Sequence, residues 1–133
     1  MYQQGFGVYQ KAHACELDQT KLILMMYAGA INFLNKALKV ANNDNIEMGM
    51  YLSKSKNVIL ELMSSLNLEK GSEMGNVLLR MYLKLYNKLN IAHMQDDVEK
   101  ITEVRDSLYE LEETWKQVFE SNECRKFKRK NAI

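Results

Sequence analysis

Two histidines and two cysteines are the residues of this chain whose spacing would most specifically indicate a zinc site or a thiol nucleophile. His13 and Cys15 stand close together near the start of the chain, whereas His93 and Cys124 are distant from them in sequence. A zinc site would need such ligands to converge from separate elements. The Glu-x-x-His pairs that build di-metal centres in helical bundles are missing, because Asn90 stands three positions before His93. The sequence predicts no metal site.

Catalytic and nucleotide-binding motifs are also missing from the sequence. The segment KGSEMG, residues 70–75, has the wrong spacing for a phosphate-binding P-loop and follows no strand pattern. Spacing alone identifies no histidine or basic partner that would activate Cys15. We therefore expect a protein that is not an enzyme and that needs no cofactor.

Composition is that of one globular domain. The chain has 133 residues, of which 47 % are hydrophobic and 26 % charged, and it has no proline. The first seven residues lack the basic cluster and apolar run of a signal peptide, and no apolar run approaches the roughly 20 residues that span a bilayer. Two cysteines give no disulfide framework. These features predict a cytoplasmic protein without membrane insertion.

Positive charge gathers at the C-terminus. Residues 121–133 carry five basic side chains against Glu123, a net charge of +4, although the whole chain has a net charge of only +1. Such a run, RKFKRK around Phe127, could contact nucleic acid or an acidic membrane surface. Short basic ends are more often solvated. We expect a flexible tail over 121–133 and no nucleic-acid partner.

Four amphipathic segments separated by short polar breaks indicate the fold. They cover about 19–41, 45–67, 73–93 and 96–119, with Asp18, Asp44 and Asp96 as predicted N-caps of the first, second and fourth. The run LILMMYAGAINFL, residues 22–34, is apolar on nearly every side and needs several neighbours to cover it. The sequence predicts an all-α protein: an antiparallel four-helix bundle over 18–120.

The fourth segment has a narrower apolar seam, on which Trp115 and Val118 are expected to face the core. Residues 1–17 form a different kind of segment. Gly5 and Gly7 discourage a long helix there, yet large apolar side chains such as Tyr9 are frequent. We expect this N-terminal arm to dock on the bundle and cover part of its surface.

Several apolar residues fall outside the predicted core stripes and could form a groove for a helix of another chain. Among nine methionines, Met25 and Met50 lie on otherwise polar faces, as does Leu60. The third segment has a second apolar stripe that could either pack inside the bundle or join this groove. The candidate binding residues are Tyr9, Met25, Met50, Leu60, Leu79, Leu83 and Tyr86.

Taken in order, these segments resemble the flagellin-specific secretion chaperone family (FliS). LILMMYAGAINFL resembles the family block LI-x-MLYDGAI-x-FL, and KSKNVILELMSSL, residues 54–66, resembles KA-x-x-II-x-EL-x-x-SL. LNLEKGSEM, residues 66–74, resembles the turn LD-x-x-x-GGE, and LEETWK, residues 111–116, resembles part of the last helix. The resemblance covers about residues 9–119, including the N-terminal Tyr9.

Three departures from the family pattern are visible, and none threatens the fold. The Ser-Pro before the first helix is replaced by Asp18 and Gln19, the Asp of the Tyr-Asp-Gly triplet is Ala28, and the turn has Gly-Ser in place of Gly-Gly. The resemblance implies a cytoplasmic export chaperone that binds the C-terminal segment of flagellin, prevents its premature polymerisation and delivers it to the flagellar type III export apparatus. The family's N-terminal arm can occupy part of the flagellin-binding surface, which suits the apolar arm of this chain.

A structural bundle that self-associates through the same exposed apolar stripes, with no client, is the alternative function. The sequence does not decide the oligomeric state, and we expect a monomer or weak dimer when the protein is free.

Overall fold

The computed structural model describes residues 17–66 and 73–120. These residues form four helices: α2 (Leu17–Val40), α3 (Asn45–Ser64), α4 (Glu73–Gln95) and α5 (Val98–Phe119). No strand is present in these two stretches. The predicted N-terminal arm, apart from Leu17, and the predicted tail lie outside the described residues.

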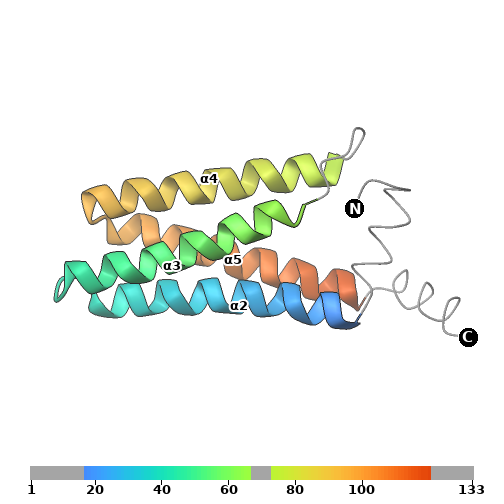
Figure 1. Cartoon of the computed structure of the whole chain (residues 1–133), viewed down its shortest axis with the longest axis horizontal. Helices are drawn as coiled ribbons and strands as arrows, with labels where there is room; N and C mark the ends of the chain where they lie inside the picture. Colours follow the sequence, from blue (N-terminus) through green and yellow to red (C-terminus); the bar gives the residue numbers. More distant parts are fainter. Residues whose placement is uncertain (1–16, 67–72, 121–133) are drawn as a thin grey trace, which may run out of the picture.

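Each helix runs opposite to the one before it, and the four form a bundle (Figure 1). Helix α2 packs against α3 and α5, and α4 packs against the same two helices from the opposite corner. The prediction of an all-α antiparallel four-helix bundle is confirmed. Because the connections are short, the α2–α3 and α4–α5 turns lie together at one end of the bundle (Figure 1).

Both of these turns use an Asn or Asp residue in the left-handed region in place of glycine. Asn42 has φ 75° after α2, and Asp96 has φ 52° after α4. Asp44 then caps α3 by accepting a hydrogen bond from the Glu47 amide at 3.0 Å, as predicted. The predicted cap of the fourth helix is wrong by one residue: Asp97, rather than Asp96, accepts from the Lys100 amide at 3.2 Å. Asp18 is not an N-cap, because α2 already begins at Leu17.

The core is built from aliphatic side chains of all four helices together with two tyrosines. Tyr27 of α2 and Tyr82 of α4 are almost completely buried at its centre. The remaining large side chains that are fully buried are Leu34, Met48, Leu52, Ile59, Leu62, Leu89, Ile101, Val104 and Leu108.

Two expectations for the fourth helix were wrong. Trp115 is only half-buried, although it packs against the core, and Val118 is 41 % exposed. Phe119 is buried instead and stacks on Trp115, with 5.4 Å between the ring centroids. The side chain that turns inward near the end of α5 is therefore one residue later than the apolar seam predicts.

Helices α3 and α4 approach closely at Gly49, which is buried under the ring of His93. A Cβ at Gly49 would lie 2.6 Å from Nε2 of His93. The His93 side chain is itself exposed, so it can move outward.

We expect Gly49→Ala alone to change the free energy of unfolding by less than about 1 kcal/mol, because better helix propensity opposes the displacement of the His93 ring. In a His93→Ala background the same substitution should stabilise the protein by about 0.5–1 kcal/mol. Chemical denaturation of the four proteins in this cycle measures the difference. An equal effect of Gly49→Ala in both backgrounds would contradict the contact.

Candidate binding surface

A polar network crosses the bundle and connects α2 with α4, two helices that lie on a diagonal. The hydroxyls of Tyr27 and Tyr82 are hydrogen-bonded to each other, and Nε1 of Trp115 donates to the Tyr27 hydroxyl at 2.9 Å. Burial raises the pKa of both tyrosines above their ordinary value. The two hydroxyls are therefore neutral at physiological pH, and the network joins α2, α4 and α5 without offering a reactive group.

This network predicts that the protein loses stability in alkali. The unfolded chain releases the tyrosine protons near the ordinary pKa of 10.0, whereas the folded protein keeps them to higher pH. The unfolded state thus binds fewer protons, so stability should be constant up to about pH 9 and then fall by about 1.4 kcal/mol per pH unit for each tyrosine.

Denaturation between pH 8 and 11 measures this slope. Tyr82→Phe should lower the slope by about 1.4 kcal/mol per pH unit, which is the contribution of one tyrosine. Stability that stayed constant to pH 11 would contradict the burial of neutral hydroxyls.

Two contacts fix the register of α3 against α4. His93 lies on Gly49, and Nζ of Lys56 donates to Oδ1 of Asn90 at 3.0 Å. Leu60 follows Lys56 by four residues, so it lies on the same side of α3, one turn further along. Since the helices are antiparallel, Leu60 comes level with residues about one to two turns before Asn90.

Two of the candidates identified in the sequence, Tyr86 and Leu83, lie at that level, and a third, Leu79, lies one turn further along α4. Tyr86, Leu83 and Leu79 precede Asn90 at spacings of four, three and four residues, which places them in one row of α4. Leu60 and Leu83 are each 42 % exposed, and Leu79 and Tyr86 are half-buried. We call Leu60, Leu79, Leu83 and Tyr86 the α3–α4 face; it is an apolar surface built from two rigid helices.

The other candidates lie elsewhere. Met50 is 47 % exposed and stands near the α2–α3 turn, where the structure adds Ile46 at 88 % and Met94 at 84 % exposure. Met25 is 60 % exposed on α2, away from the α3–α4 face. Tyr9 lies outside the described residues. Sequence reasoning overlooked Ile46 and Met94 because each stands beside a polar break, although Ile46 precedes Met50 at helical spacing.

A second apolar surface, overlooked in the sequence, lies along α4 and α5. Met74 and Met81 precede Lys88 at seven-residue spacing, and Lys88 reaches Glu103 of α5 at 3.0 Å. Met74 lies about four turns before Lys88, and Val118 lies about four turns after Glu103. Because α4 and α5 are antiparallel, Met74 and Val118 lie at the same level of the bundle. Met74, Val77, Met81 and Val118 are 60, 42, 40 and 41 % exposed; we call them the α4–α5 strip.

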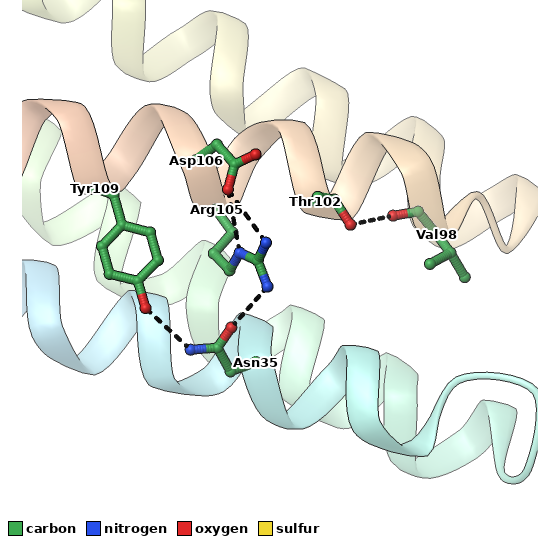
Figure 2. A network of polar contacts seen from close by, with 6 residues as sticks. All are labelled: Asn35, Val98, Thr102, Arg105, Asp106 and Tyr109. Atoms are coloured by element: carbon green, nitrogen blue, oxygen red, sulfur yellow. Dashed lines mark hydrogen bonds and ion pairs between the residues drawn. The ribbon is translucent and has the colours of Figure 1, made fainter.

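The side where α2 meets α5 is polar by contrast. Figure 2 shows Asn35 between the two helices, accepting from Nη1 of Arg105 at 3.2 Å and facing the hydroxyl of Tyr109 at 3.4 Å. Arg105 also bonds Asp106. The hollow beside this network is lined by Ala28, Ile31, Asn32, Asn35, Tyr109 and Glu112. Asn35, Tyr109 and Glu112 of this lining already have polar partners. The polar character of the hollow makes it a weak candidate for an apolar client.

Lysines cover the aromatic side chains where α2 meets α3. Nζ of Lys54 lies 5.7 Å from the centre of the Phe33 ring and 6.0 Å from that of Tyr51. Lys36 lies 5.8 Å from the same Tyr51 ring. Apart from the exposed residues near the α2–α3 turn, the α3–α4 face and the α4–α5 strip are apolar surfaces of the described residues to which two neighbouring helices contribute.

Residues 17–66 and 73–120 contain no cluster of metal ligands and no helix that could span a membrane. No group of three or more His, Cys, Asp or Glu side chains in these stretches is placed to hold a metal ion. None of the four helices combines the length and hydropathy needed to cross a membrane.

Comparison with known proteins places this bundle in a family. Residues 2–122 match the family described as flagellar protein FliS. The chain is 30 % identical over 115 residues to the flagellar secretion chaperone FliS of Campylobacter jejuni subsp. jejuni serotype O:6 (strain 81116 / NCTC 11828), covering 86 % of this chain and 90 % of the relative. Flagellar secretion chaperone FliS of Bacillus subtilis (strain 168) is 30 % identical over 122 residues, covering 90 % of this chain and 89 % of the relative. The Escherichia coli (strain K12) protein of the same name is 29 % identical over 102 residues, covering 75 % of each chain. The chain therefore belongs to the FliS family of flagellar proteins.

Proposed function

We propose that this protein is a cytoplasmic export chaperone that binds the C-terminal segment of flagellin, prevents its premature polymerisation and delivers it to the flagellar type III export apparatus. The α3–α4 face is the proposed contact surface. The observation that carries the proposal is that Leu60 of α3 comes level with Leu83 and Tyr86 of α4, which share one row with Leu79, in a bundle that belongs to the FliS family.

The physical character of this face suits a client that folds on binding. A disordered segment loses conformational entropy when it orders, so it needs apolar anchors to offset that loss. Exposed leucines on two packed helices provide such anchors without rearranging the chaperone, and half-buried Tyr86 has a hydroxyl as well as an apolar ring. An amphipathic helix of the client would place its apolar positions along this face.

Solution mass and calorimetry test the proposal against a self-associating bundle. The free protein is mixed with a peptide of the flagellin C-terminal segment, and mass is measured with and without peptide. We expect a monomer or weak dimer when free and a defined complex with heat of binding when mixed. A stable oligomer whose mass is indifferent to the peptide would favour the self-associating bundle.

Loss of the basic tail should leave flagellin binding intact. A chain that ends at Ser121 keeps α2 to α5 and all side chains of the α3–α4 face. We expect it to fold and to bind the flagellin peptide within a few fold of the full chain at physiological salt, because screening already weakens exposed charges beyond about 8 Å. Calorimetry compares the two chains. Abolished binding of a folded truncated chain would place the tail in the binding site.

A further inference from the structure

The α4–α5 strip ends where the described chain ends. Helix α5 stops at Phe119 and is capped by Glu120, and α4 begins at the same end of the bundle (Figure 1). Met74 of the strip is in the first turn of α4, and Val118 is in the last turn of α5. Any segment that continues from α5 therefore starts beside this apolar surface.

The exposed side of α5 that faces away from the core is acidic. Glu103, Asp106, Glu110 and Glu113 are all exposed and recur at spacings of three and four residues, which puts them in one row. Glu103 pairs with Lys88, and Asp106 pairs with Arg105. Within the described residues, Glu110 and Glu113 have no cation within 4.0 Å.

The segment that continues from α5 has the complementary chemistry. Residues 121–133 hold RKFKRK, in which basic side chains flank Phe127. The family match ends at residue 122, so the basic run is outside the part of the chain that the family accounts for. Six residues of a fully extended chain span about 20 Å. That length corresponds to about 13 residues of helix, enough to bring the run back past Glu113 and Glu110.

We propose that residues 121–133 dock on the α4–α5 strip of their own chain, with Phe127 among its apolar side chains and the basic residues along Glu110 and Glu113. Arg80 and Lys84 of α4 are exposed on the other side of the strip and would repel the basic run. The run therefore lies on the α5 side of the strip. Direct covalent connection favours this segment over a separate partner through its high effective concentration. The docked tail covers the strip and leaves the α3–α4 face open for a client.

Methionine oxidation by hydrogen peroxide, followed by peptide mass spectrometry, tests the proposal on the full chain. Met74 and Met81 report on the strip, whereas Met25 and Met94, 60 and 84 % exposed, report on other surfaces of the same molecule. We expect Glu110→Lys/Glu113→Lys to speed oxidation of Met74 and Met81 at least about threefold, as should 1 M salt, which shortens the screening length to about 3 Å. Phe127→Ser should do the same, and Met25 and Met94 should keep their rates in every variant.

The matched control is Glu61→Lys/Glu99→Lys, which makes the same change of net charge on α3 and at the far end of α5. Both of its glutamates are exposed, and it should leave the strip methionines as slow as in the parent chain. If neither the charge reversal nor Phe127→Ser changed the oxidation rates of Met74 and Met81, the proposal would be overturned. Slow oxidation that appeared only as protein concentration rises would also overturn it, because that result would assign the strip to a second copy of the chain.

Discussion

Replacing Tyr27 with phenylalanine should cost about 2–4 kcal/mol of the free energy of unfolding, because two partners lose their hydrogen bonds at once. The Tyr27 hydroxyl accepts from Nε1 of Trp115 at 2.9 Å and is hydrogen-bonded to the Tyr82 hydroxyl. Tyr82 is 1 % exposed, so water cannot replace the lost bond at its hydroxyl. Trp115 is half-buried and recovers part of its loss through solvent.

Two matched substitutions test this explanation, because the loss of side-chain volume alone does not predict the order of their effects on the free energy of unfolding. Tyr82→Phe leaves the bond from Trp115 to Tyr27 in place and should cost about 1–2 kcal/mol. Trp115→Phe leaves the bond between the two tyrosines and should cost a similar amount, part of it from the smaller ring. Urea denaturation of the three single variants supplies the comparison. If Tyr27→Phe cost no more than Tyr82→Phe, Tyr27 would not be the centre of the network.

The helical segments follow from the sequence because apolar residues recur with a period near 3.6 and polar breaks separate them. The same periodicity explains why the end of α5 was misplaced. A strict three-four alternation drifts by about 20° per seven residues on a straight helix. After the turns from Ile101 to Leu111, that drift accumulates, and Phe119 rather than Val118 faces the core.

The hydrogen-bonded network could not be derived from the sequence, although its residues could be placed on core stripes. Tyr27 and Tyr82 meet across a diagonal of the bundle, and periodicity within one helix carries no information about which distant residue lies opposite. The caps present a similar limit: Asp96 and Asp97 are chemically alike, and only the backbone decides which one adopts the left-handed conformation. Exposure of Leu60 was predicted from its position, whereas the sequence left open whether Leu83 packs inside the bundle or lies on the surface. The common level of the two leucines depends on the register set by Gly49 and Lys56.

Replacing Leu60 and Leu83 together with serine should lower the affinity for the flagellin C-terminal segment at least tenfold. Each leucine is an exposed apolar anchor on the α3–α4 face, and loss of such an anchor from an interface costs about 1–2 kcal/mol. Because both side chains are 42 % exposed in the free protein, the substitutions should change its free energy of unfolding by less than about 1 kcal/mol. Stability and affinity should therefore separate in this variant, which calorimetry and thermal unfolding measure on the same preparation.

The control is Val77→Ser/Val118→Ser, since these α4–α5 strip residues match the leucines in exposure at 42 and 41 %. Removing apolar surface there should leave flagellin affinity within a few fold, because the α3–α4 face is intact. The double variant Met50→Ser/Leu60→Ser extends the test toward the α2–α3 turn. If its flagellin affinity were lower than that of Leu60→Ser alone, the client site would extend to Met50. Unchanged affinity in the folded Leu60→Ser/Leu83→Ser protein would exclude the α3–α4 face as the main contact. The exposed side of α2 around Met25, 60 % exposed, would then be the next apolar surface to substitute.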